Sequence, residues 1–173
     1  MTRYLALILL LLPSAALSQD AHHGHQSPYA GQEERAITSL SADDILELER
    51  GGGWGLAKPA ELNGVPGPRH VLDLARDLSL TEAQQAKIED LFERMKSEAV
   101  AEGGRYLEAE RAVDALFRRP DVNPGDLAKA LSDAEQSRGR LRYIHLSVHI
   151  ETMGILTPDQ VRGYAVLRGY RKT

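Results

Sequence analysis

Cysteine is absent from the 173-residue chain, and aromatic residues make up only 5% of it. Without cysteine the protein has no disulfide, no thiolate metal site, no thiol nucleophile and no lipid attachment through an N-terminal cysteine. Few aromatics beside 42% hydrophobic and 27% charged residues favour amphipathic helices over a β-sandwich. The formal net charge of −4 argues against a nucleic-acid partner.

One apolar run, Tyr4–Leu12, stands near the N-terminus. It is too short to remain as a membrane span, and small residues occupy the −3 and −1 positions of a cleavage site ending at Ser18. We therefore expect residues 1–18 to be a cleaved signal peptide, with an uncleaved N-terminal anchor as the alternative. The rest of the sequence contains no segment that could cross a membrane, so we expect export without stable membrane insertion, to the periplasm of a two-membrane bacterium.

Residues 19–38 are expected to form a disordered tail that contains His22, His23 and His25. Imidazole nitrogens in a short histidine tract bind metal ions weakly. A solvated tail without a ligand is the alternative interpretation.

Residues 39–68 predict a short helix followed by a loop rich in glycine and proline. Ser41 is a good N-cap for the helix, and the run Gly51-Gly52-Gly53 ends it. Trp54, the single tryptophan, comes next in the loop. We expect Trp54 to dock on the helices, because a lone aromatic in such a loop usually anchors it; a binding role is the alternative.

A short motif, Leu-Thr-x-x-Gln, occurs at residues 80–84 and again at 156–160, which is 76 positions later (156 − 80). Its threonine suits a helix N-cap and its glutamine the N3 position, so that the two side chains form a capping box. The motif therefore predicts that helices start at both places, with four capping residues: Thr81, Gln84, Thr157 and Gln160.

Between the two motifs, apolar residues recur at helical spacing over two long segments of residues 69–170. The first predicted helix ends before Pro120, with Gly103-Gly104 expected to bend or loosen it. The second is capped by Asn123 and is expected to end near Met153, at Gly154. A short turn joins them, which predicts an all-α fold built on a long antiparallel hairpin with short flanking helices.

The strongest chemical signal is the pair His145 and His149 on the second long helix. Residues four apart share a helix face, so both imidazoles can reach one metal ion, and Met153 adds a thioether one turn further on. Glu98 or Glu102 from the facing helix, or a partner chain, are candidates to complete the site. Two interfacial histidines with ordinary hydrogen bonds are the alternative, and His70 is expected to be an isolated surface residue.

Two Leu-Thr-x-x-Gln motifs flanking a helical hairpin, in an exported chain without cysteine, resemble the Spy/CpxP family. That family includes the zinc-resistance-associated protein and heavy-metal sensors of the CnrX type. The resemblance covers about residues 70–168 and implies a periplasmic helical dimer that acts as an ATP-independent chaperone, a stress-response modulator or a metal binder. The Gly51–Pro68 segment and the net charge of −4 depart from the short, basic chaperone members.

We therefore expect a periplasmic metal-binding stress protein that responds to heavy-metal or envelope stress, with holdase activity toward unfolded or membrane-protein clients. The expected cofactor is a divalent ion such as zinc, copper or nickel, and the expected assembly is a homodimer, because one hairpin has too few neighbours to cover its apolar stripes. The alternative is a regulatory module that restrains a membrane-bound sensor and holds no metal. No pattern indicates an enzyme.

Overall fold

The computed structural model describes residues 27–172 and divides the chain into two units, residues 1–31 and 32–173. Of the first unit only residues 27–31 are described, and they lie mostly in turns. The expected signal peptide and the histidines of the tail, His22, His23 and His25, lie outside the described residues. The rest of this section concerns the second unit.

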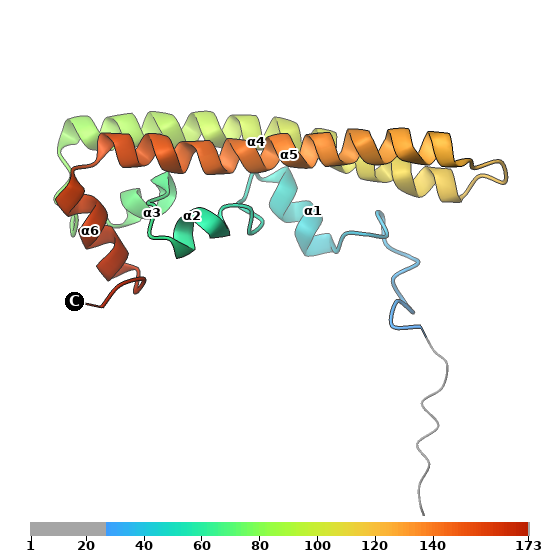
Figure 1. Cartoon of the computed structure of the whole chain (residues 1–173), viewed down its shortest axis with the longest axis horizontal. Helices are drawn as coiled ribbons and strands as arrows, with labels where there is room; N and C mark the ends of the chain where they lie inside the picture. The colour runs from blue at the N-terminus through green and yellow to red at the C-terminus, as the bar shows by residue number, and fades with distance from the viewer. Residues whose placement is uncertain (1–26, 173) are drawn as a thin grey trace, which may run out of the picture. The chain divides into compact units, whose positions relative to one another are not determined.

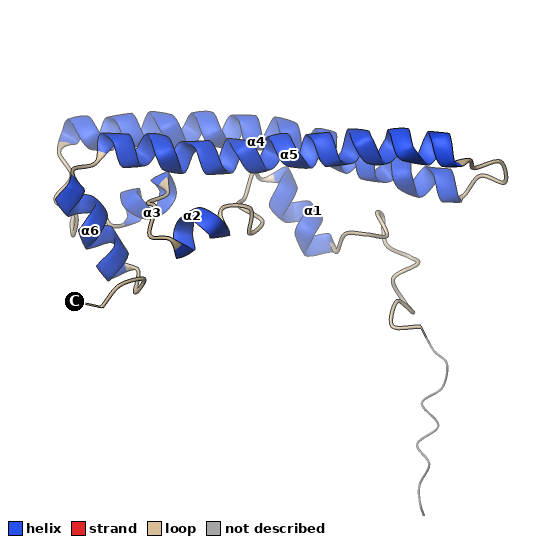
Figure 2. Cartoon of the chain, viewed as in Figure 1, coloured by secondary structure: helices blue, strands red, loops and turns tan. Residues whose placement is uncertain are grey.

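The second unit consists of helices and connecting loops, and no strand occurs in its described part (Figure 2). This confirms the predicted all-α class. Along the chain the helices are α1 (Ala42–Glu49), α2 (Lys58–Leu62), α3 (Pro68–Asp73), α4 (Glu82–Phe117), α5 (Pro124–Ile155) and α6 (Pro158–Leu167). None of these described helices is both long and apolar enough to span a membrane.

The long helices α4 and α5 pack side by side as the predicted antiparallel hairpin, with α1, α2, α3 and α6 on one side of it (Figure 1). Asn123 caps α5 by accepting hydrogen bonds from the N–H groups of Gly125 and Asp126 at 2.9 and 3.0 Å. α5 runs through Gly154 to Ile155, so the predicted end at Gly154 was wrong. The helix stops at Leu156, whose backbone is extended, and Thr157, ahead of Pro158, is extended as well.

The pair Gly103-Gly104 does not interrupt α4, which continues as one helix. Gly103 instead lets α1 come close, because a Cβ atom on it would lie 2.6 Å from the backbone oxygen of Leu48. Leu48 is fully buried at this crossing. The glycine therefore serves a helix contact rather than a bend.

The Gly51–Pro68 segment contains a helix that the sequence did not predict, the five-residue α2. It has no side-chain cap and is too short to show a periodic pattern. Trp54 docks as expected: its indole N–H donates to Asp44 Oδ1 at 2.8 Å, and its ring centroid lies 5.6 Å from that of Tyr106.

Both Leu-Thr-x-x-Gln motifs form the predicted capping boxes, at the starts of α4 and α6. Their glutamines also bond to each other: Gln84 Nε2 donates to Gln160 Oε1 at 2.8 Å, and Gln160 Nε2 donates to Gln84 Oε1 at 3.1 Å. Gln84 Nε2 also donates to the backbone oxygen of Ile155 at 3.0 Å, and Gln160 Nε2 to those of Leu78 at 3.2 Å and Ser79 at 3.5 Å. We call this arrangement the glutamine clasp.

Replacing either glutamine of the clasp by alanine should lower the free energy of unfolding by about 1–2 kcal/mol, because it removes half of a capping box and the reciprocal amide bonds. The double variant Gln84→Ala/Gln160→Ala should cost less than the sum of the two single changes, because each single change already breaks the shared bonds. Urea unfolding measures these changes in stability. Gln85→Ala is the matched control, because the side chain of Gln85 bonds to Glu89 and takes no part in the clasp. Strict additivity would contradict the clasp.

Candidate functional site

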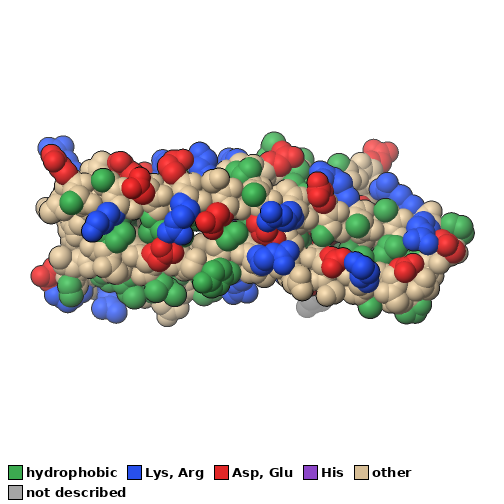
Figure 3. Space-filling view, turned by 90° about the horizontal axis from the view of Figure 1, so that it is seen from above, with side chains coloured by type: hydrophobic (Ala, Val, Ile, Leu, Met, Phe, Trp, Pro, Cys, Tyr) green, Lys and Arg blue, Asp and Glu red, His purple; other side chains and the backbone are tan. Residues whose placement is uncertain are grey.

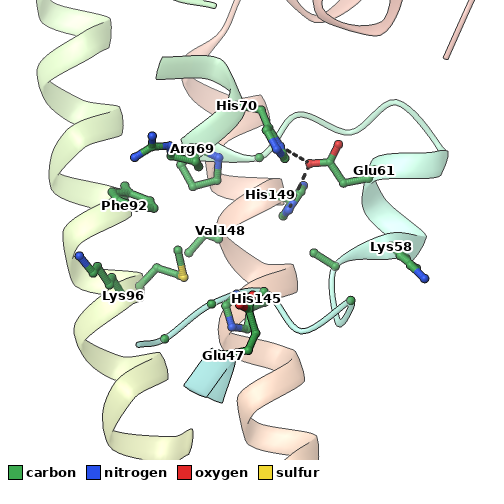
Figure 4. A pocket seen from close by; sticks show the side chains of 18 of the residues that line it. Glu47, Lys58, Glu61, Arg69, His70, Phe92, Lys96, His145, Val148 and His149 are labelled. Atoms are coloured by element: carbon green, nitrogen blue, oxygen red, sulfur yellow. Dashed lines mark hydrogen bonds and ion pairs between the residues drawn. The ribbon is translucent and has the colours of Figure 1, made fainter. Parts of the chain in front are cut away.

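A cavity of about 720 Å³ lies against the inner side of α4 and α5 and is closed by α1, α2, α3 and the glycine-rich segment between them (Figure 4). Its apolar wall includes Phe92, Met95 and Val148. The titratable side chains that line it come from five helices and the segment after α1: Glu47, Arg50, Lys58, Glu61, Arg69, His70, Lys96, His145 and His149. The cavity therefore collects three histidines from two distant parts of the chain.

His145 lines this cavity and is only 5% exposed, yet its Nε2 atom has no hydrogen-bond partner among the described residues. Burial, and next the neighbouring His149, lower the pKa of His145, while a hydrogen bond with the Gly52 backbone favours a proton on the ring. In the neutral ring the other nitrogen, Nδ1, is thus the protonated one, and Nε2 presents a lone pair. A buried polar atom without a protein partner is uncommon, and a water molecule or an ion at this position would satisfy it.

His149 is held in the same way from the next turn of α5. Its Nδ1 atom lies 3.0 Å from the backbone oxygen of Val65, which can only accept, so Nδ1 carries the hydrogen. Its Nε2 atom lies 4.0 Å from Glu61 Oε1. Gly67 makes room for the ring, because a Cβ atom there would lie 2.6 Å from His149 Cε1. The backbone carbonyl of Val65 therefore sets the tautomer and orientation of the His149 ring.

Glu61 of α2 lies beside His149 (Figure 4) and accepts hydrogen bonds from the hydroxyls of Tyr164 and Tyr170, each 2.9 Å from its Oε2 atom. His70 Nδ1 lies 3.1 Å from Glu61 Oε1, so His70 is part of the cavity wall and not an isolated surface residue. Burial alone would raise the pKa of Glu61, but the hydrogen bonds from Tyr170, Tyr164 and His70 outweigh it and lower the pKa. Glu61 is therefore a carboxylate anion.

Met153 does not line the cavity and is 42% exposed. Each step of four residues turns about 40° around a helix, so two steps carry Met153 well past the direction of His145. A metal site that uses Met153 together with His145 and His149 stays a prediction. Of these three side chains, only His145 and His149 line the cavity.

Glu102, a candidate to complete the site, points elsewhere. It is only 2% exposed and accepts hydrogen bonds from Ser137 Oγ at 2.6 Å, Arg105 at 2.6 Å and Arg140 at 2.9 Å. Burial alone would raise its pKa, but these three partners lower it. Glu98 is exposed on the outside of α4. Neither carboxylate lines the cavity.

The two imidazoles fit a metal ion in their chemistry, because both line one cavity and both bond to the backbone through a ring nitrogen, as metal-ligating histidines usually do. Imidazole nitrogen suits zinc, copper and nickel. Within residues 27–172, however, no group of three or more His, Asp or Glu side chains is arranged to hold an ion. The described residues thus offer two candidate ligands, and a third would have to come from a change in side-chain positions.

The sequence did not point to Glu61, His70 or Gly67 as site residues. They lie some 80 residues before His149, in α2, in α3 and in the loop between them, and their spacing follows no ligand motif. The packing of this segment over α5 brings them together, and no local sequence pattern predicts that packing.

Fold and site together define an all-helical hairpin protein with a cavity lined by histidines. The model of the heavy-metal-resistance family matches residues 54–163, and the chain belongs to this family, which covers Spy/CpxP-like proteins and CnrX-type sensors. No curated protein and no solved structure shows significant similarity to the chain. The match begins at Trp54, so it includes α2, α3, α4 and α5 but not α1 or the run Gly51-Gly52-Gly53, which also line the cavity.

The lowered pKa of Glu102 predicts how stability depends on pH. The folded protein holds this carboxylate ionised below its ordinary pKa of 4.5, so the stabilisation is present above pH 4.5 and is lost as pH falls through the lowered pKa. Glu102→Gln should be less stable than the wild type at pH 7, by about 1–3 kcal/mol, and less sensitive to pH between 5 and 3. Urea unfolding over this range, with Glu98→Gln as the exposed control one turn away, checks it; parallel pH curves for the wild type and Glu102→Gln would contradict it.

Proposed function

We propose that this protein of the heavy-metal-resistance family is an exported metal binder that acts in heavy-metal or envelope stress. Its helix ligands are His145 and His149, and its ion is zinc, copper or nickel. The observation that supports this proposal is the pair of buried rings that line one cavity and bond to the backbone through one nitrogen each, with His145 Nε2 left without a partner among the described residues.

This arrangement lowers the cost of binding in two ways. The rings are already oriented, so little side-chain entropy remains to be lost when an ion arrives. The pKa of His145 is already lowered by burial, so its ring is neutral and needs to release no proton before it coordinates. A bound ion would supply a positive charge that accepts the lone pair of His145 Nε2.

The histidines of the tail, His22, His23 and His25, form a second and separate set of candidate ligands. A short histidine tract binds metal ions weakly, so the tail should bind more weakly than the cavity, where contacts with the backbone orient the rings. Separating the two sets is therefore the first requirement of any binding experiment.

Calorimetric titration of the mature protein with Zn²⁺, Cu²⁺ and Ni²⁺ tests the proposal. The variant His145→Ala/His149→Ala should lose at least tenfold in affinity, because it removes both oriented ligands. The variant His22→Ala/His23→Ala/His25→Ala should keep the tight site, and Met153→Leu reports whether the thioether takes part. Equal binding by the wild type and the cavity variant would remove the cavity from consideration and leave only the tail.

A second candidate function is holdase activity, and exposed hydrophobic side chains on the hairpin favour it. The outer face of α4 and α5 presents such side chains between charged ones, and no histidine is visible among the described residues of that face (Figure 3). The large exposed hydrophobic side chains of the two helices include Phe117, Leu131, Tyr143 and Ile150. These residues offer a surface either for unfolded clients or for a second copy in a homodimer.

Replacing Tyr143 and Ile150 by serine separates these roles from metal binding. If the face holds clients, the wild type should suppress aggregation of a chemically denatured test protein at equimolar amounts, and Tyr143→Ser/Ile150→Ser should suppress it several-fold less, with metal affinity unchanged. Light scattering coupled to size exclusion reports whether the same change dissociates a dimer. Absence of suppression by the wild type would count against the holdase role.

A further inference from the structure

We propose that a second hollow, beside Trp54, binds an acidic peptide segment of a partner protein through the guanidinium groups of Arg138 and Arg142. The hollow has a volume of about 340 Å³ and lies between residues 54–59 and α5. Besides a glycine, its lining residues are Trp54, Leu56, Lys58, Pro59, Arg138 and Arg142. We call it the arginine hollow. Neither arginine lines the histidine cavity, so this site is independent of the proposed metal binding.

The charged groups of the arginine hollow all have the same sign. Lys58, Arg138 and Arg142 line it, and no carboxylate does so among the described residues. Lys58 also borders the histidine cavity, but its ammonium group points away from the histidines there (Figure 4). The chain as a whole has a formal net charge of −4, so the hollow is a local exception. An acidic group is therefore attracted to this place rather than to the surface in general.

The two arginines lie four positions apart on α5, so their side chains extend from one face of the helix. Like charges at this spacing repel each other, and the pair therefore does not stabilise the helix. Arg138 Nη1 lies 3.6 Å from Oε2 of the exposed Glu135, whereas Arg142 forms no ion pair within the described part of the chain. An anion bound across both guanidinium groups would remove the repulsion. A carboxylate suits this position, because its two oxygens match the planar fork of a guanidinium group.

Trp54 gives the hollow a wall in a fixed position. Its backbone has a φ angle of 42°, which is unfavourable for a bulky residue, so the surrounding contacts must hold it. Its indole N–H donates to Asp44 Oδ1 at 2.8 Å, and its ring packs on Tyr106. The guanidinium carbon of Arg138 lies over this ring, 6.0 Å from the centroid. A guanidinium group that stacks on an aromatic ring is already oriented, so it loses less freedom when it binds a carboxylate.

The carboxylate of Asp44 does not compete for the arginines. Its Oδ1 atom accepts from Trp54, and its Oδ2 atom accepts from the backbone N–H and the hydroxyl of Ser41 at 2.9 and 2.6 Å. These bonds form the capping box at the start of α1. The acid nearest the ring is thus committed to the fold, and the cationic groups stay available to a partner.

The shape and the walls of the arginine hollow favour a peptide over a lipid surface or a free small anion. A concave space of about 340 Å³ admits a few side chains but not the flat face of a bilayer. The net charge of −4 also opposes approach to an anionic membrane. Exposed ion pairs each contribute little, so a free anion gains little here. A peptide combines its carboxylates with apolar contacts, which Leu56 and Pro59 provide beside the cations.

Fluorescence of Trp54 tests this proposal, because Trp54 is the only tryptophan of the chain. The probe is a short synthetic peptide of alternating glutamate and leucine, which has no aromatic residue of its own. Its addition to the mature protein at low salt should change the emission in a saturable way. Physiological salt should weaken the binding severalfold, because salt screens exposed charges. The same peptide with lysine in place of glutamate should leave the emission unchanged.

Variants locate the binding. Arg142→Gln should lower the affinity for the glutamate peptide severalfold, and Arg138→Gln/Arg142→Gln should lower it roughly tenfold, because two charge contacts are lost. Arg111→Gln is the matched control, since Arg111 is an exposed arginine of α4 that does not line the hollow, and it should bind the peptide as the wild type does. Arg138 and Arg142 are exposed, so the variants should fold, and urea unfolding checks this. Zinc affinity should stay unchanged in all three variants.

Each outcome supports or overturns the proposal. Unchanged emission of the wild type with the glutamate peptide overturns it, and so does equal peptide affinity of the wild type and the double variant. Binding to vesicles of phosphatidylglycerol and phosphatidylcholine without binding to the peptide would assign the hollow to a membrane instead. Free glutamate as effective as the peptide would assign it to a small anion. Loss of zinc binding by the wild type would overturn the proposed function and leave this inference intact.

Discussion

The glutamine clasp is the constraint on which the rest of the arrangement depends. Gln84 and Gln160 satisfy each other's amides and bond to the backbone oxygens of Ile155 and Leu78, so they tie together the starts of α4 and α6, the end of α5 and the segment before α4. Every donor and acceptor of the two amides is used, and for that reason the geometry has little freedom.

The clasp in turn positions the cavity. By fixing where α6 begins, it directs Tyr164 under the hairpin, where the hydroxyl reaches Glu61 on α2. Glu61 then stands next to His149 and His70. A capping motif at the end of the hairpin is thus connected, through one helix and one carboxylate, to the place where the imidazoles converge.

The cavity owes its character to backbone atoms as much as to side chains. Gly52 and Val65 lie in the glycine-rich segment that wraps over α5, and their backbones bond to His145 and His149. Such a wrap is feasible because Gly51, Gly55 and Gly64 adopt positive φ angles that other residues rarely take. This segment therefore supplies part of the walls of the cavity.

The sequence by itself determined the helical class, the hairpin, and the starts of α1, α4, α5 and α6, because caps and apolar periodicity are local signals. It also singled out His145 and His149 as candidate ligands, because two residues four apart share one face of a helix. Tertiary structure alone decided the short α2, the use of Gly103 as a contact, the engagement of Glu102 and the convergence of Glu61 and His70 on His149. Those features depend on which distant surfaces meet, and contacts between residues some 80 positions apart leave no periodic trace in either segment.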